Sequence, residues 1–595
     1  MDATNAPTAA EKPPEIPTVY LTLGVGALVA FTLWTWGGAK VAGALGDTDD
    51  ALRLVLVRDL LSGRAGWWDQ HFARLQPPLG MDLHWSRLVD GGIAAVERGL
   101  GLFMDPAHAE LAARTVWPFL WLFPVIAAAL SIARSLRGPV AAFLCAALML
   151  VNLPLFAQWA PGRIDHHDVQ IALCLVALAG VVRGGRGGSA LAGAATGLGL
   201  AVGIEGLIFE ALIGAAVAVR FLIDPLAERR AARAYALGLA FSLLPLFLIE
   251  TPPARWGVSV CDTIGLNLAA GVAVACAGLV AATALTARRG LGVRAGSVGL
   301  VGLAAGATYL GLLPACLHGP LAQADPRLWP VWLSHISEMR SLFLGFPDLG
   351  NGFAISEIVF HAVAAAAWLW LGRRPEQRTI AWGLLGACLA AGVAAETQAQ
   401  RMSFYTSWFA TPIVAAAVVQ LGAVWFRRRL VPMVIIAVAA SPTWASAAIA
   451  ALHPTGKDAI NGDRDQSGCT APADYRRLAA LPTGLVLSEV DLGPYVLATT
   501  PHAVIAAPYH RMAWGILSAR AALDARPDAA APAVRRLHAT YVVACPRRNR
   551  DRPHNPWPAT SLQAALERDT PPAWLQPMSP PAEPLQVYLV KPSGP

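Results

Sequence analysis

Residues 162–168, Gly-Arg-Ile-Asp-His-His-Asp, concentrate side chains that could do chemistry in one short segment. The segment lies between two apolar runs, residues 140–154 and 169–182. Charged groups at the ends of membrane spans are costly and usually mark function. Two carboxylates beside two imidazoles can bind a divalent cation or exchange protons. The alternative interpretation is an ordinary polar connection between two helices.

The composition is that of a polytopic membrane protein. Of the 595 residues, 55% are hydrophobic and 14% are charged, and the mean hydropathy is +0.49. These values exclude an ordinary soluble protein. The net charge of +7 comes mostly from arginines in short loops, so it does not indicate a nucleic-acid partner. Residues 1–17 are predicted to be a disordered cytoplasmic N-terminus without the basic start of a cleavable signal.

About thirteen apolar runs approach the length of membrane spans. They cover residues 19–41, 111–133, 139–158, 169–182, 189–203, 206–222, 234–249, 264–287, 296–316, 355–371, 379–395, 402–425 and 430–451. Every even-numbered run ends in a short basic loop, from Arg134 and Arg137 after the second to Arg427, Arg428 and Arg429 after the twelfth. Basic loops stay in the cytoplasm. The sequence therefore predicts an integral protein of the inner membrane, with a cytoplasmic N-terminus and a periplasmic C-terminal region.

The loops between the basic ones are acidic, and their acids stand directly at span ends. They hold Asp47, Asp49, Asp50, Asp165, Asp168, Glu205, Glu250, Asp262, Glu338 and Glu396. The first of these outer loops is long, residues 42–110. An apolar side over residues 52–61 predicts a helix lying on the membrane, and Trp67, Trp68 and Trp85 are expected at the membrane interface.

The apolar runs stop at about residue 453, which predicts a transmembrane domain over residues 18–452 and a soluble domain over residues 453–595. Strands over residues 485–490, 503–507, 540–544 and 585–590, with helices over residues 475–481 and 516–525, predict a small α/β domain. Its two cysteines, Cys469 and Cys545, are expected to form a disulfide in an oxidising compartment. The other six cysteines lie in or near apolar runs and are expected to be inert.

The outer loops resemble, in order, the motifs of the GT-C glycosyltransferases, specifically the catalytic subunit of oligosaccharyltransferases. That family has an Asp with an Arg six residues later, as at Asp47 and Arg53 here. Its later Asp-x-Asp or Asp-Asn-Glu motif is similar to residues 165–168, with His167 standing where the family has an acid. Its Thr-Ile-x-Glu motif is similar to residues 335–338, His-Ile-Ser-Glu. Residues 489–493, Glu-Val-Asp-Leu-Gly, resemble its Trp-Trp-Asp-Tyr-Gly motif, but both tryptophans that help recognise the acceptor sequon are missing.

The resemblance implies an enzyme that moves a sugar or oligosaccharide from a polyprenyl phosphate or pyrophosphate donor to an acceptor at the outer face. The acceptor, whether lipid, polysaccharide or protein, is left open. Predicted metal ligands are Asp47, Asp165, His167 and Glu338, whose oxygen-rich set suits Mn²⁺ or Mg²⁺. The three acids are also the predicted catalytic residues, and Asp47 is expected to help activate the acceptor.

Further polar residues of the outer loops are expected to bind the substrate. They are Arg53, Arg163, His166, Asp168, Arg401, Asp491, His510 and Arg511. Arginine pairs well with phosphate, although a contact with lipid headgroups is the alternative for each arginine. A transporter or flippase, and a binder of lipid-linked glycans without activity, are the competing hypotheses. Transporters hold ionisable groups near the membrane midplane, whereas nearly all acids here stand at one edge, which favours the enzyme.

Overall fold

The computed structural model describes residues 17–345, 352–426, 429–452, 469–546 and 557–592. Most of the N-terminal segment predicted to be disordered, the boundary predicted near residue 453, and Arg427 and Arg428 of the last basic loop lie outside these residues.

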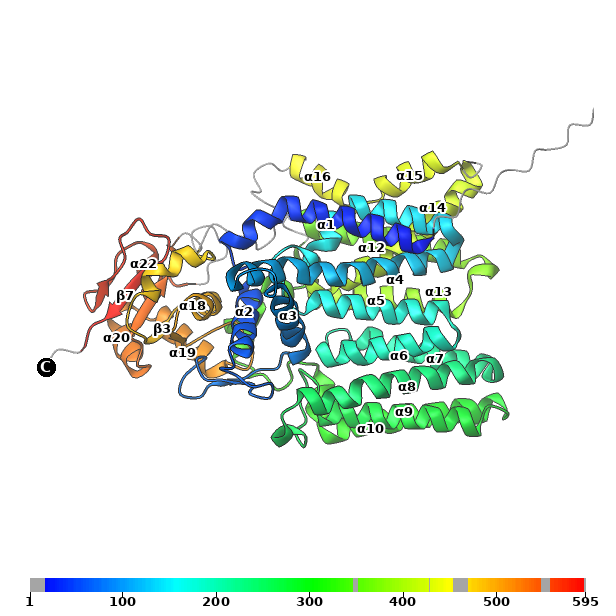
Figure 1. Ribbon diagram of the computed structural model, residues 1–595, viewed down its shortest axis with the longest axis horizontal. Coiled ribbons are helices and arrows are strands. Elements are labelled where there is room, and N and C mark those ends of the chain that lie inside the picture. Colours follow the sequence, from blue (N-terminus) through cyan, green and yellow to red (C-terminus); the bar gives the residue numbers. More distant parts are fainter. Residues whose placement is uncertain (1–16, 346–351, 427–428, 453–468, 547–556, 593–595) are drawn as a thin grey trace, which may run out of the picture.

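Long helices lying side by side form most of the molecule (Figure 1). They are α1 (Thr18–Gly43), α4 (Pro106–Val151), α5 (His167–Arg183), α6 (Gly185–Val202), α7 (Leu207–Ile223), α8 (Pro225–Glu250), α9 (Leu266–Leu285), α10 (Leu291–Leu312), α12 (Gly352–Gly372), α13 (Ile380–Glu396), α14 (Ser403–Trp425), α15 (Leu430–Ala439) and α16 (Pro442–Leu452). Short turns join them: η1 (Leu153–Trp159), η2 (Pro253–Arg255), η3 (Pro314–His318), α11 (Leu328–Val331), η4 (Leu333–His335), η5 (Ser337–Met339), η6 (Leu342–Gly345), η7 (Pro375–Gln377) and η8 (Gln400–Met402).

Every predicted apolar run falls mainly on these helices, and the last run covers both α15 and α16. The 46-residue α4 carries two runs, because non-helical backbone at Arg137 and Gly138 interrupts it, with φ +75° at Gly138. Among the described residues, seven helices are long and apolar enough to cross a membrane, and the bent pair α15 and α16 would add an eighth. The chain is therefore a multi-pass membrane protein, whereas the count of thirteen spans stays a prediction.

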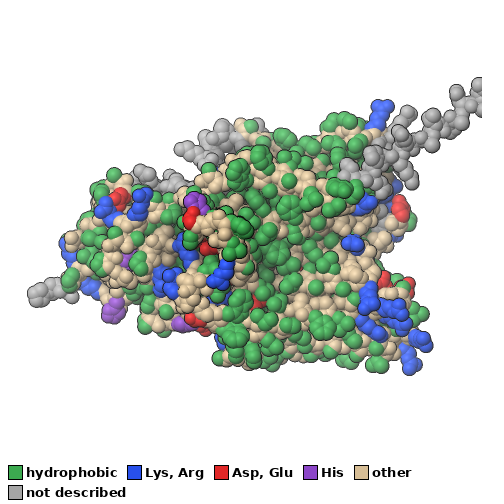
Figure 2. Space-filling model, in the orientation of Figure 1, with side chains coloured by type: hydrophobic (Ala, Val, Ile, Leu, Met, Phe, Trp, Pro, Cys, Tyr) green, Lys and Arg blue, Asp and Glu red, His purple; other side chains and the backbone are tan. Residues whose placement is uncertain are grey.

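Apolar side chains on the outside of the bundle indicate that lipid is its solvent. On α10 no residue is buried, and Leu300 and Leu303 are 67% and 73% exposed. Figure 2 shows hydrophobic side chains covering the helices, with Lys and Arg side chains gathered at the end of the bundle away from the C-terminal region. Soluble proteins rarely expose such a continuous apolar surface. By contrast, α14 is mostly buried and lies inside the bundle.

Between α1 and α4, the first loop forms α2 (Thr48–Leu61), β1 (His71–Phe72), β2 (Met81–Asp82) and α3 (Arg87–Leu100). Asp47 and Asp50 form a capping box at the start of α2, which satisfies N–H groups that a helix otherwise leaves unpaired. Residues 50–57 of α2 are all buried, and α2 packs against α3 and against a helix of the C-terminal region. The expectation that this helix lies on the membrane surface is therefore wrong.

The C-terminal region lies at one end of the bundle (Figure 1). It contains η9 (Pro472–Tyr475), α17 (Arg476–Ala479), β3 (Leu485–Leu487), η10 (Val490–Leu492), α18 (Gly493–Thr499), β4 (Ala503–Val504), α19 (Ala513–Asp524), α20 (Pro527–Arg536), β5 (Tyr541–Ala544), α22 (Leu562–Glu567), β6 (Leu575–Pro577) and β7 (Gln586–Val590). Five strands form one sheet in the order β4-β3-β5-β7-β6, parallel among β4, β3 and β5 and antiparallel around β7.

The first loop extends this sheet. The backbone N–H of Gln76 donates to Val504 O at 2.8 Å, and the Val504 N–H donates to Arg74 O at 2.9 Å. The Arg74 guanidinium also donates to the backbone carbonyls of Leu497, Thr500 and His502. Backbone hydrogen bonds of this kind hold two segments in a fixed register. These bonds fix the C-terminal region to the first loop. We call the end of the bundle that carries both of them the site end.

Two disulfides lie at the site end. The predicted bond between Cys469 and Cys545 is present, with Cα atoms 6.2 Å apart. A second bond joins Cys261 and Cys316, with Cα atoms 5.1 Å apart, so the expectation that these two cysteines are inert is wrong. Cys261 precedes α9 and Cys316 follows α10. Because α9 and α10 are joined by a short turn and pack side by side, their other ends lie together.

Alkylation of the unfolded protein should count these bonds. Without reductant, we expect four thiols to react, those of Cys145, Cys174, Cys276 and Cys388, and after reduction all eight cysteines. The Cys261→Ser variant should show five reactive thiols without reductant, because Cys316 loses its partner. Intact-mass spectrometry measures the number of labels, and eight labels without reductant would contradict the prediction.

Candidate active site

Asp50 links the start of α2 to the acidic segment at residues 162–168. Its Oδ1 accepts hydrogen bonds from the backbone N–H groups of Ile164 at 2.7 Å and Asp165 at 3.2 Å. Asp50 is 1% exposed. Burial raises the pKa of its carboxyl well above the ordinary value, and the negative charge of Asp165 raises it further. The buried Asp50 side chain therefore positions the backbone of residues 162–168.

Asp47 has a capping and pairing role in this arrangement. Its Oδ1 accepts from the N–H groups of Asp49 and Asp50, both at 3.0 Å, and its Oδ2 contacts Arg163 Nη1. The other guanidinium nitrogen of Arg163, Nη2, lies 3.8 Å from Asp165 Oδ2. One arginine thus fills the space between Asp47 and Asp165, the two acids predicted to share a metal ion.

Asp165 lies at the centre of the site. Its Oδ1 is 2.5 Å from His166 Nδ1, and its Oδ2 contacts His167 Nδ1. Burial alone would raise the pKa of Asp165, but the charges of His166 and His167 outweigh burial and hold it well below its usual range. Ligand atoms of the three residues lie within 4.8 Å of one another, so the group has the spacing of a metal site.

A chain of opposite charges continues from Asp165 to a third loop. His167 Nε2 lies 3.2 Å from Glu205 Oε2, and Glu205 Oε1 lies 2.8 Å from Arg401 Nη1. Burial would raise the pKa of Glu205, but Arg401 and His167 lower it. Both ring nitrogens of His167 therefore face carboxylates, which suits a residue that orients Asp165 and Glu205.

Asp49, on α2, is not among the predicted site residues, but it interacts electrostatically with the central acids. Burial raises the pKa of this half-buried carboxyl well above its usual range, and the negative charges of Asp165 and Glu338 raise it further. Burial lowers the pKa of Arg401, on η8, and the charge of Glu205 raises it. Glu338, on η5, and Asp49 raise the pKa of Arg401 further, each by less than Glu205 does. Asp49, Asp165 and Glu338 thus come from three distant segments into one electrostatic environment.

A sequence signal could have separated Asp49 from its neighbours. The pair Asp47 and Asp50 has the spacing of a capping box, in which the first and fourth residues satisfy each other's backbone. The remaining acid, Asp49, is then the one not needed to start the helix. The choice of Asp47 rested instead on its distance from Arg53.

Arg53 is fully buried beside the central acids. Its Nη1 lies 2.7 Å from Asp90 Oδ1, and its Nη2 lies 3.4 Å from His166 Nδ1. The guanidinium carbon lies 4.4 Å from the Trp85 ring, a favourable cation–π contact. Trp85 is 8% exposed and packs edge-on against Tyr509, so the expectation that it lies at the membrane interface is wrong.

The other predicted residues lie around this centre. Asp168 is buried on the first turn of α5, where its Oδ1 accepts from the Val169 N–H. Asp491 lies on η10, directly before α18, which packs against α2. The substrate-binding roles expected for Asp168 and Asp491 therefore stay predictions.

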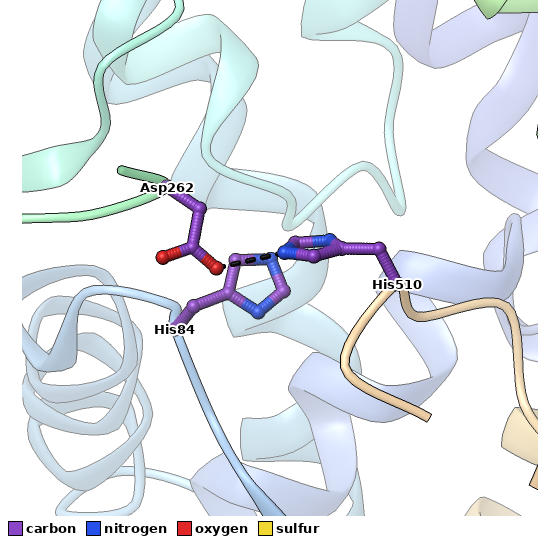
Figure 3. Close-up of side chains that lie close together, drawn as sticks. All are labelled: His84, Asp262 and His510. Carbon is purple, nitrogen blue, oxygen red and sulfur yellow. Dashed lines mark hydrogen bonds and ion pairs between the residues drawn. The ribbon is translucent and has the colours of Figure 1, made fainter. Parts of the chain in front are cut away.

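His510 and Arg511 pair with an acid of another loop. Asp262 Oδ2 lies 2.7 Å from both His510 Nε2 and Arg511 Nε, and Asp262 Oδ1 lies 2.7 Å from Arg511 Nη2. Burial would raise the pKa of Asp262, but these hydrogen bonds hold it well below its usual range. The ring of His84 lies beside that of His510 (Figure 3). Tyr509 donates to Thr48 O at the start of α2, so this segment covers the site.

This bundle of apolar helices, whose acidic loops meet beneath a C-terminal region, is similar in fold to an archaeal oligosaccharyltransferase. The apo oligosaccharyltransferase of Archaeoglobus fulgidus aligns with a TM-score of 0.64 at 14% identity over 89% of this chain and 70% of that chain. The same enzyme tethered to an acceptor peptide with the NVT sequon aligns with a TM-score of 0.64 at 15% identity, with the same coverage. Its complex with an inhibitory peptide and a dolichol-phosphate aligns with a TM-score of 0.61 at 13% identity, again with the same coverage.

No family model and no curated protein matches this sequence. The structural matches alone confirm the predicted resemblance to oligosaccharyltransferases, at the level of fold.

Proposed function

We propose that this protein is a glycosyltransferase that moves a sugar or oligosaccharide from a polyprenyl phosphate or pyrophosphate to an acceptor at the periplasmic face of the inner membrane. The observation that carries the proposal is that acidic loops far apart in the chain meet at Asp165, at the end of a lipid-facing bundle. Asp50, at the start of α2, accepts hydrogen bonds from the backbone of Ile164 and Asp165, and His167 beside Asp165 pairs with Glu205 of a third loop. Asp49 and Glu338 add negative charge near this centre. A donor with a polyprenyl chain would lie in the bilayer with its phosphate at this depth.

In the proposed reaction, the acceptor attacks the anomeric carbon of the sugar, and the bond from that carbon to the phosphate oxygen breaks. The phosphate keeps the electron pair and stays on the lipid. The acceptor proton passes to a carboxylate, for which we assign Asp49.

Positive groups around the cluster suit a departing phosphate. The N-termini of α2 and α5 both lie at the site, with Thr48 and His167 as their first residues. Helix N-termini favour anions. Arg401, on η8, pairs with Glu205 of the third loop, and a guanidinium can bind phosphate oxygens in a bidentate manner. His166, at the N-cap of α5, is a further donor toward the phosphate.

The residues present fit a divalent cation. The negative charges of Asp165 and Glu338 act on Asp49, and a cation would relieve this repulsion. We assign these three acids as ligands of Mn²⁺ or Mg²⁺, with Asp49 in place of the predicted Asp47 and His167 positioning Asp165. When bound, the ion would neutralise negative charge that develops on the leaving phosphate.

An assay with the purified protein tests the proposal. Radiolabelled polyprenyl-phosphate and polyprenyl-pyrophosphate sugars are supplied with envelope lipids, polysaccharide or peptide as acceptors. We expect label to move to one acceptor class, and we expect chelation of divalent cations to lower the rate at least tenfold. The Asp165→Asn variant is the control for contaminating activity. Donor binding without cleavage of the sugar–phosphate bond would favour a non-catalytic binder.

The orientation proposed here has its own test. Reporter fusions after Arg429 and after Pro595 should show opposite sides of the membrane, because the basic loops are expected to stay inside. Alkaline phosphatase should be active only on the second fusion, and green fluorescent protein should fluoresce only on the first. Equal signals from both positions would mean that the span count is wrong.

A further inference from the structure

A second group of ligating side chains lies apart from the central acids. His84 lies between β2 and α3, Asp262 lies between η2 and α9, and His510 lies between β4 and α19. Their ligating atoms lie within 4.8 Å of one another, and the ring centroids of His84 and His510 are 4.6 Å apart. Figure 3 shows the three side chains pointing toward one another from separate segments.

A small cavity adjoins this group. It has a volume of about 30 Å³, and His84, Glu250 and Arg511 are among the residues that line it. A polar cavity of roughly 10–15 Å³ is enough for one water molecule. The space therefore suits an ion with a water molecule, and it is too small for a sugar.

Two polar atoms at the cavity have no hydrogen-bond partner among the described residues. They are Nδ1 of His84 and Oε1 of Glu250, and Glu250 is only 2% exposed. An unpaired buried polar atom costs about 1–3 kcal/mol. Such atoms indicate that something absent from the protein chain completes the site.

We infer that His84, Asp262 and His510 bind one divalent transition-metal ion, with Zn²⁺ as the ion that fits best. Two imidazoles and one carboxylate are a common zinc ligand set, in which water takes the fourth position. The inference does not rest on the proposed function, because none of these residues belongs to the Asp49, Asp165 and Glu338 cluster.

Two neighbouring side chains support metal binding: Arg511 orients Asp262, and Glu250 lines the cavity. Arg511 holds both oxygens of Asp262 through two hydrogen bonds of 2.7 Å, and metal-bound carboxylates are commonly oriented by such outer partners. The Glu250 oxygen that lacks a partner can accept from the metal-bound water. A plain ion pair between Asp262, His510 and Arg511 leaves the Glu250 oxygen without a partner.

The ion would join three segments over the active site. His84 precedes Trp85, which contacts Arg53, and His510 follows Tyr509, which reaches the start of α2. A metal between His84 and His510 would hold Trp85 and Tyr509 together, at their ring-centroid distance of 5.4 Å. We therefore assign it a structural role in fixing the C-terminal region against the first loop.

Metal content of the full-length protein in detergent tests the inference. The protein is stripped with chelator, loaded with Zn²⁺ alone, freed of excess ion and measured by mass spectrometry of the elements. We expect the His84→Gln, Asp262→Asn and His510→Gln variants each to hold one zinc per chain fewer than the parent. The Asp165→Asn variant should keep this zinc, which separates it from a cation at the central acids.

His108→Gln is the matched control, because His108 also pairs with an aspartate, Asp105, but on the surface. It should bind as much zinc as the parent. Zinc should also raise the melting temperature of the parent and of His108→Gln by more than that of His84→Gln, which keeps only the central acids as a possible cation site. A parent that holds no more zinc than the His84→Gln/His510→Gln double variant would overturn the inference.

A spectroscopic test does not depend on variants that lose a ligand. Co²⁺ in the parent should give the intense visible bands of a four-coordinate site. In the His84→Cys variant, which can still bind the ion, a new thiolate-to-cobalt charge-transfer band should appear in the near ultraviolet. Absence of that band in a folded His84→Cys variant would place the ion elsewhere and overturn the assignment.

Discussion

Replacing Asp49 with asparagine should lower the rate of sugar transfer by at least about 100-fold, the range lost with a general base. Asparagine keeps the size of the side chain but can neither accept the acceptor proton nor contribute a negative charge to the cluster. The hydrogen bonds that start α2 come from Asp47 and Asp50, so the helix should remain intact. The measurement is the initial rate with a labelled polyprenyl-linked sugar.

Asp47→Asn is the matched control two residues away. Asparagine is as good an N-cap as aspartate, so this variant loses only the charge that pairs with Arg163. We expect the rate of sugar transfer to fall by less than about tenfold, because the Asp47 carboxylate binds Arg163 and not the substrate. The opposite ranking, with Asp47→Asn inactive and Asp49→Asn active, would restore Asp47 as the catalytic acid and refute our assignment.

Replacing Arg53 with methionine should cost about 3 kcal/mol of stability, the lower end for breaking a buried ion pair. The Arg53 side chain is fully buried and pairs with Asp90 at 2.7 Å. Its loss leaves Asp90 with Arg87 as its remaining partner, at 3.0 Å. Because the Trp85 ring also packs on Arg53, the first loop should loosen. The measurement is the apparent melting temperature in detergent.

Arg64→Met provides the comparison for this effect. Arg64 also pairs with an aspartate of α2, Asp59, but its side chain is 67% exposed. Surface pairs contribute little, so we expect no measurable shift in the melting temperature. Equal melting temperatures for Arg53→Met and the parent would show that the pair is not a stabilising contact.

The sequence by itself determined the class of protein and much of its order along the chain. Long apolar runs must be helices in a membrane, because lipid offers no partner for a free backbone group. The runs therefore located the helices. The alternation of acidic and basic loops placed Asp165 and Glu338 on the same side, and the structure brings them into one electrostatic environment. The disulfide between Cys469 and Cys545 followed from their being the two cysteines of the tail.

Only the tertiary structure decided which acids face one another. Asp47 caps α2 and Asp50 lies in its first turn, and both carboxylates reach Arg163, whereas Asp49 on the same turn interacts with Asp165 and Glu338. Their directions depend on where α2 begins and on what packs against it. Nothing in the local sequence states that Arg163 would reach back to Asp47. The choice between neighbouring acids is therefore a property of packing.

The same limit applies to pairs that meet across the chain. Cys261 and Cys316 looked inert because each adjoins an apolar run, and they bond because α9 and α10 pack side by side. His84, Asp262 and His510 show no ligand spacing in the sequence, since they lie in three loops more than a hundred residues apart. His84 and His510 meet because the first loop and the C-terminal region share a sheet edge, and Asp262 is held to His510 and Arg511 by hydrogen bonds. Contacts between distant loops depend on the relative placement of whole segments, which the local pattern of residues does not encode.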